Sequence, residues 1–368
     1  MKKILIIALF AAVILAGCKD ESEENFSDNQ SFSIVRTGAY SDKGFYAVDE
    51  DDCLVCFIDK NSYTSTPLCS KPNCTHDGSS CNAYYEGLYG VYVNDGSVYV
   101  MAEEVKNGSM DLYKLSMDGS EKSKVRTLFQ TEGEDTAYSA EFIIHRGVGY
   151  LAVNWLQEDG ENEREQILYR VSLKDDGMDD VFKVKGYSPV IHLVSTDEDN
   201  IYFSSSIYKS PSQKAEDEET AGHCYNGKDG SVTDIPVPSD QMFEACYADT
   251  VHSMLRDRDM GTMMDKKLEF FASDIDGNNN RSVYKLENVQ VAGIFRDDKY
   301  RYIEIEDASN SHMKMVDYDG REICDFNTEG KRAMWSDGEN LLFRDYESGK
   351  FSLFNIETSK ETVIEGTD

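Results

Sequence analysis

The sequence predicts an all-β protein, a β-propeller built from four-stranded blades. Tyr and Phe are abundant, at 22 and 17 residues, whereas the chain holds only 6 Pro, and aromatic residues favour strands. Beyond residue 32, no long segment carries the apolar stripe of an amphipathic helix. In addition, one order of elements recurs along the chain: strand, tight turn, aromatic strand, variable loop, strand, Asp-Gly turn and strand. Such self-similarity is the sequence signature of a repeat architecture.

The N-terminus carries an export signal. Met1–Lys3 is basic and Ile4–Leu15 is an unbroken apolar run, which is too short to cross a bilayer core because that takes about 20 residues. Leu15–Cys18 reads Leu-Ala-Gly-Cys and resembles the bacterial lipobox. The resemblance implies cleavage before Cys18 and a diacylglyceryl group on its sulfur. We therefore expect residues 1–17 to be a lipoprotein signal peptide, with the protein held by Cys18 on the outer face of the bacterial cytoplasmic membrane.

Residues 18–32 separate this anchor from the repeats. The segment is rich in Asp and Glu and has a single aromatic residue, Phe26. Because it cannot bury enough apolar surface to fold, we interpret it as a flexible tether. The propeller domain is then expected over residues 33–368.

The clearest repeat unit runs from Tyr89 to Phe129. Asp95-Gly96 and Asp118-Gly119 supply the positive φ angles that tight hairpins need. The expected strands are Tyr89–Asn94, Ser97–Glu104, Met110–Met117 and Lys124–Phe129.

Six further units share this order, and units of roughly 40 residues with four strands are typical of propeller blades. We expect seven blades; the count becomes six if the first unit is incomplete, and eight is the other alternative. The first strands of these six units are Ser33–Ala39, Glu141–His145, Val190–Thr196, Phe243–Ala248, Val289–Phe295 and Ala333–Trp335.

The long connections of the repeats join second to third strands. They are Gln157–Glu165, Lys209–Gly222 and Asp257–Lys266, and the strand order places all three on one face of the ring. Loops on a rigid scaffold commonly carry recognition. We therefore expect this face to bind a ligand, whereas the acidic run at residues 216–219 is interpreted as a solvated hairpin.

A cysteine- and histidine-rich segment follows the first unit. Cys69, Cys74, His76 and Cys81 have the spacing C-x4-C-x-H-x4-C. Three thiolates and an imidazole can complete a structural Zn²⁺ site, but export also permits a disulfide from Cys69 or Cys74 to Cys81. Both alternatives, and free thiols, stay open. As a connection between two units, the segment is expected on the face of the long loops.

The same segment carries a family resemblance. Leu68–His76, followed by Cys81–Ala83, resembles a segment found early in uncharacterised lipoproteins of Gram-positive gut anaerobes with TolB-like β-propeller repeats. The resemblance covers the whole mature chain. It implies a fold and a location and no reaction.

The remaining cysteines give weaker signals. Cys53 and Cys56 are three apart on an expected strand, so they would point to opposite faces and could not easily share a ligand. Buried small hydrophobes are the expected role of Cys224, Cys246 and Cys324.

Composition and motifs narrow the function. The net charge of −32 argues against nucleic acid, since phosphate binding needs clustered Lys and Arg. The sequence has no H-E-x-x-H, G-x-S-x-G or G-x-x-x-x-G-K-[ST] motif, and no catalytic residue is assigned. We therefore expect a non-enzymatic module that binds a protein, peptide or glycan. The alternatives are a loop-built glycan lyase or hydrolase, or an accessory lipoprotein of an envelope complex.

Overall fold

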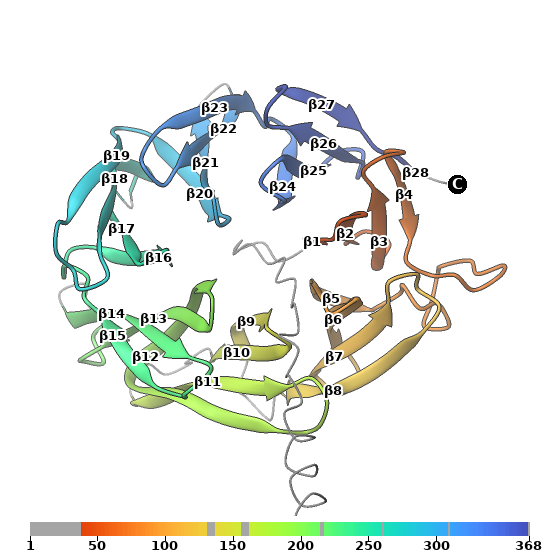
Figure 1. Cartoon of the computed structure of the whole chain (residues 1–368), viewed down its shortest axis with the longest axis horizontal. Helices are drawn as coiled ribbons and strands as arrows, with labels where there is room; N and C mark the ends of the chain where they lie inside the picture. The colour runs from red at the N-terminus through yellow and green to blue at the C-terminus, as the bar shows by residue number, and fades with distance from the viewer. Residues whose placement is uncertain are drawn as a thin grey trace, which may run out of the picture.

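The computed structural model describes residues 38–130, 137–155, 162–213, 217–259, 261–307 and 310–366. Antiparallel sheets are arranged as a ring around a central axis (Figure 1), which confirms the all-β propeller. None of the described residues is in an α-helix, and none belongs to a helix able to cross a membrane. The expected signal peptide, the lipid site Cys18 and the tether lie outside the described residues.

Strand pairing sorts the described strands into groups of four, each in sequence order from the axis outward. The first two groups are β1 (Gly38–Tyr40), β2 (Gly44–Asp49), β3 (Leu54–Asp59) and β4 (Thr64–Pro67), then β5 (Gly87–Asn94), β6 (Ser97–Glu104), β7 (Ser109–Ser116) and β8 (Lys122–Gln130). The next two are β9 (Ala137–His145), β10 (Val148–Trp155), β11 (Arg164–Ser172) and β12 (Met178–Asp197), then β12 again with β13 (Asn200–Tyr208), β14 (Glu218–Asn226) and β15 (Val232–Ile235).

Three more groups complete the ring. They are β16 (Met242–Tyr247), β17 (Thr250–Asp259), β18 (Met264–Asp274) and β19 (Arg281–Leu286); β20 (Gln290–Arg296), β21 (Tyr300–Asp307), β22 (Asn310–Asp317) and β23 (Glu322–Asn327); and β24 (Lys331–Ser336), β25 (Asn340–Asp345), β26 (Phe351–Asn355) and β27 (Lys360–Val363).

β12 is shared between two groups. Its first half pairs with β11, from Met178 to Gly186, and its second half pairs with β13, from Tyr187 to Asp197. One continuous strand therefore leaves the outer edge of one group and becomes the inner strand of the next.

The hairpins are longer than the sequence suggested. β17 and β18 extend over Asp259 and Met264, so most of the expected loop Asp257–Lys266 is strand. β14 likewise begins at Glu218, inside the expected loop Lys209–Gly222. The charged residues of these segments favoured a loop prediction, but in the structure their backbones pair across the hairpins. Residues 156–161 and 214–216, which cover parts of the other expected loops, lie outside the described residues.

The tight turns largely follow the Asp-Gly expectation. Asp95 and Gly96 have φ of 45° and 63°, the pair of positive angles that a type I′ hairpin requires. Gly177 is the exception, because its φ angle is not positive. There Ser172 bonds back to the carbonyl of Gly177 over 2.9 Å, so the turn between β11 and β12 is a wider one.

The core lies between neighbouring groups. Val48 and Val55 of the first group pack with Val91 and Val100 of the second, and equivalent clusters fill the other junctions. Burying each such side chain contributes about 1.5–3 kcal/mol. The junctions therefore hold the ring together and keep its central space open.

The first and last groups of described strands meet at one junction. β28 (Glu365–Gly366) pairs in parallel with β4, next to Thr64 and Ser65. Trp335 and Ile364 pack there with Phe45 of the first group. Arg344 donates to Asp49 over 3.0 Å across the same junction. Closure thus combines strand pairing, apolar contact and ion pairs.

Candidate functional site

The four residues of the Cys/His cluster come together. The ligand atoms of Cys69, Cys74, His76 and Cys81 all lie within 4.8 Å of one another. Zn–S bonds of about 2.3 Å put two ligand atoms no more than about 4.6 Å apart, so small side-chain movements suffice to close on an ion. His76 Nδ1 is 3.2 Å from Cys81 Sγ. The cluster can therefore hold a metal ion, and all four described cysteines and histidines of the segment take part.

Backbone turns shape this segment. Cys69 N donates to the Pro67 carbonyl over 2.7 Å, and Cys81 N to the Gly78 carbonyl over 2.9 Å. Asn73 and His76 adopt positive φ angles of 57° and 58°, which bend the chain back on itself. The ligand side chains are thus gathered by local turns within a single connection.

The electrostatics of the thiols differ. Burial raises the pKa of the Cys69 thiol, but hydrogen bonds from the backbone N–H groups of Lys71 and Asn82 outweigh it and lower that pKa. Burial and the neighbouring thiols raise the pKa of Cys81 to about 12. Three thiolates therefore do not form together unless a cation binds them, which fits the donor set of a Zn²⁺ site.

The connection that holds the cluster lies between the first two groups, where Tyr85 N donates to the Cys53 carbonyl over 3.0 Å beside the β2–β3 connection. Asn82 Nδ2 donates to the carbonyls of Gly119 and Ser120 over 2.9 and 3.1 Å, so the segment packs on the β7–β8 turn. A Cβ on Gly119 would lie 2.4 Å from the Leu68 carbonyl oxygen, so only glycine permits this approach. Figure 1 shows the connection between β4 and β5 at the outer rim of the ring.

The other cysteines lie apart from the cluster. Cys53 has a φ of 57° in the turn before β3, and Cys56 is buried within β3. Cys246 is buried, whereas Cys224 and Cys324 are partly buried against apolar clusters. These environments fit the expected roles as small hydrophobes.

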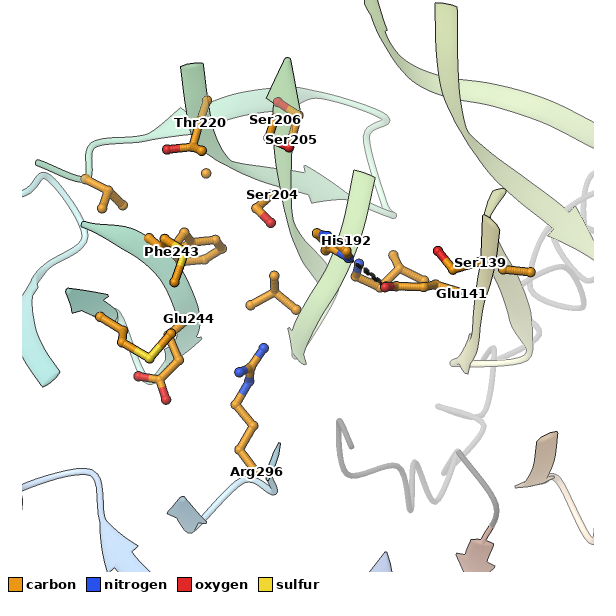
Figure 2. A pocket seen from close by; sticks show the side chains of 18 of the residues that line it. Ser139, Glu141, His192, Ser204, Ser205, Ser206, Thr220, Phe243, Glu244 and Arg296 are labelled. Atoms are coloured by element: carbon orange, nitrogen blue, oxygen red, sulfur yellow. Dashed lines mark hydrogen bonds and ion pairs between the residues drawn. The ribbon is translucent and has the colours of Figure 1, made fainter. Parts of the chain in front are cut away.

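A cavity of about 680 Å³ opens at the middle of the ring. Its walls include the starts of β9, β14 and β16 and the second halves of β12 and β13 (Figure 2). Apolar side chains such as Leu193, Phe243 and Met254 supply much of the lining. This volume lies in the range of small-molecule and peptide sites.

Three carboxylates of the cavity are held by hydrogen-bonding partners. Glu141 binds His192 Nδ1 over 2.7 Å, and it also accepts from the Leu193 backbone N over 2.7 Å. Arg332 donates to Glu50 over 3.0 and 3.2 Å. These contacts fix the positions of the carboxylates in the cavity walls.

The third pair is completely buried. Arg301 Nε is 2.9 Å from both oxygens of Glu244, and their exposed fractions are 0% and 2%. The guanidinium of Arg301 also lies 4.4 Å from the ring centre of Tyr318, a cation–π contact. This pair ties β16 to β21 beside the cavity.

Arg296 is the cavity cation without a partner. It ends β20, and Figure 2 shows its side chain reaching toward the space between Glu244 and His192. No hydrogen bond or ion pair joins it to any of the described residues, and its Nε is buried without a partner. Sequence reasoning missed Arg296, Glu244 and Arg301; the only local signal was a charged residue inside or beside an apolar strand.

A chain of hydrogen bonds joins Ser205, His223 and Asp234. Ser205 Oγ is 2.8 Å from His223 Nε2, and His223 Nδ1 is 2.9 Å from Asp234 Oδ1. Burial lowers the pKa of His223, so the ring is neutral at pH 7. The order resembles that of serine hydrolases, but Ser205 and His223 are only 6% and 5% exposed. The two residues lie on neighbouring strands of one sheet, and the hydrogen bonds link β13, β14 and β15.

Comparison with known proteins supports the fold. No family model matches the sequence, and no curated protein does. A prolyl endopeptidase structure is 12% identical, with a TM-score of 0.60 over 89% of this chain and 49% of that one. The β-propeller domain of the Trilobed protease from Pyrococcus furiosus is 8% identical, with a TM-score of 0.53 over 92% and 97%.

TolB from Acinetobacter baumannii is also similar, at 9% identity and a TM-score of 0.43 over 77% of this chain and 63% of that one. The chain spans about half the length of the prolyl endopeptidase that it matches. At such low identities the likenesses to the prolyl endopeptidase and to the Trilobed protease domain show the fold alone, and an activity has to be argued from the residues of this chain.

Proposed function

We propose that this chain is a membrane-tethered binding protein, held by a lipid on Cys18 at the outer face of a bacterial cytoplasmic membrane. The observation that carries the binding role is the central cavity of about 680 Å³, built on the inner strands of a packed ring. Such a site is preformed, so little ordering entropy opposes binding. The ligand site is thus the cavity, in place of the loop face expected from the sequence.

Binding is favoured over catalysis by the state of the cavity's ionisable groups. A glycosidase or lyase needs an acid and a base free to exchange protons with the substrate. Of the four cavity carboxylates, Glu50, Glu141 and Glu244 are each held in a pair with a basic side chain, and the fourth, Glu218, is exposed to solvent. The solved structures that resemble this fold include enzymes, but at no more than 12% identity. We therefore assign the cavity a binding role.

Filling the cavity is expected to abolish binding. Ala221 is exposed on β14 and lines the cavity, so Ala221→Trp occupies the space without disturbing the core. Peptide and glycan arrays first identify ligands of the full-length wild-type protein. We expect Ala221→Trp to bind these ligands at least about tenfold more weakly, a loss of roughly 1.4 kcal/mol. Ala248→Trp, on the exposed turn after β16, is the matched control. Equal retention by both variants would place the ligand elsewhere.

The tether has its own test. Cys18→Ser removes the sulfur that the diacylglyceryl group needs, and the anchor is expected to supply membrane affinity through two acyl chains. We expect this variant to leave the membrane fraction, as followed by fractionation and immunoblotting. Unchanged membrane association of the variant would refute the lipid anchor.

The Cys/His cluster has a structural role in this proposal. We assign Zn²⁺ to Cys69, Cys74, His76 and Cys81, since their ligand atoms lie within 4.8 Å of one another. Four protein ligands leave no open position, which is typical of structural zinc and not of catalytic zinc. The ion would fix the connection between the first two groups against the β7–β8 turn.

A further inference from the structure

Arg296 gives the cavity a charge that no described residue balances. The chain as a whole carries a net charge of −32, yet this guanidinium reaches into the cavity with no ion pair to the described residues (Figure 2). Arg296 is partly buried, and its Nε is shielded from water without a hydrogen-bond partner, which is unfavourable for a polar group. An anionic group of a ligand would supply the missing partner of the Arg296 side chain.

The neighbouring carboxylates do not serve as that partner. Glu244 has both oxygens on Arg301 Nε at 2.9 Å, and Glu141 has its oxygens on His192 and on the Leu193 backbone N. Glu218, the remaining cavity carboxylate, is exposed on β14. The uncompensated charge beside Glu244 is therefore positive.

The expected charge of the ligand follows from the unpaired guanidinium of Arg296. A guanidinium matches the two oxygens of a carboxylate in a fork geometry. One unpaired guanidinium balances one negative charge, so a carboxylate matches Arg296 better than a phosphate dianion does. The cavity is thus suited to a single carboxylate.

The rest of the lining describes the body of the ligand. Leu193, Val194, Phe243 and Met254 form an apolar wall, and methionine adapts to different shapes. The lining also holds hydroxyl groups without a side-chain partner among the described residues, which can bond to amide groups; they belong to Ser204, Ser206 and Thr220. Apolar side chains, amides and one carboxylate together describe a short peptide better than a sugar chain.

We propose that the cavity binds the C-terminal end of a short apolar peptide, with its carboxylate on the Arg296 guanidinium. This inference rests on the proposed binding role of the cavity and names the class of ligand. The peptide's last side chain would lie against Phe243, and its amides would face the hydroxyls of β13 and β14.

The test compares free and amidated C-termini. Fluorescent tripeptides with apolar side chains, as free acids and as amides, are titrated onto the full-length protein in detergent by anisotropy. We expect the acids to bind about 10- to 100-fold more tightly than the amides, since a hydrogen bond to a charged group is lost on amidation. Arg296→Gln is expected to remove this preference, and Arg296→Lys to restore part of it.

Arg321→Gln is the control, because it removes the same charge from an exposed residue of β22–β23, and its acid preference should equal that of the wild type. Equal binding of acids and amides by the wild type, or an unchanged preference in Arg296→Gln, overturns the inference while the binding role stands. If neither peptide form binds, or an acidic sugar binds instead, the peptide inference is wrong. The Ala221→Trp comparison then decides separately whether the cavity binds anything.

Discussion

Glu244→Ala is expected to destabilise the propeller by about 3–5 kcal/mol. The substitution leaves the Arg301 guanidinium, which is 0% exposed, without its carboxylate partner. The guanidinium keeps a hydrogen bond of 3.3 Å to the Asp317 carbonyl and its contacts with the rings of Tyr318 and Phe270. A buried charge of this kind cannot regain its lost hydration, so the folded state becomes less stable. Urea unfolding, followed by Trp fluorescence, measures the change.

Two further variants show whether the loss of stability comes from the buried Glu244–Arg301 pair or from the loss of any cavity carboxylate. Glu218→Ala removes an exposed carboxylate that also lines the cavity, and its effect should stay within about 0.5 kcal/mol. Replacing both partners, Glu244→Met with Arg301→Met, should recover much of the loss because no buried charge remains. A single Glu244→Ala variant as stable as the wild type would contradict the role assigned to the pair.

Cys81→Ser is expected to abolish zinc binding and to loosen the connection between the first two groups. Structural zinc sites contribute directly to folding free energy, and Cys81 is 1% exposed at the centre of the cluster. We expect one zinc per chain in protein purified without oxidant, measured by atomic emission, and none in the variant. Faster proteolysis between β4 and β5 should accompany the loss.

Cys53→Ser is the matched control, since Cys53 lies in a turn outside the cluster, and it should keep the zinc. An intact mass short of two hydrogens, with no metal, would show a disulfide from Cys69 or Cys74 to Cys81 instead. That result would refute the zinc assignment and leave the role of the connection unchanged, because either cross-link fixes it.

The strands could be predicted from the sequence because their signals are local. Asp95-Gly96 and Asp118-Gly119 mark hairpin ends, and the strands between them agree within about two residues. The Cys/His cluster could be predicted for the same reason, since one connection holds all its ligands. The outer strand that begins at Met178 was missed because its charged residues look like loop, although they pair with β11.

The cavity could not be predicted from the sequence. Glu244 and Arg301 are 57 residues apart and meet only because two groups are neighbours in the ring. Arg296 lies at a strand end that looks like any other turn. The packing of the Cys/His segment could not be predicted for a related reason: it depends on how closely Leu68 approaches Gly119, a contact between two groups.

The central claim is that this propeller binds its ligand in the middle of the ring. A crystal structure of the full-length protein with a bound apolar tripeptide acid tests it most directly. The account predicts ligand density in the cavity, with the carboxylate on Arg296 and a side chain on Phe243. Density confined to the β17–β18 hairpin or to the outer rim would contradict it.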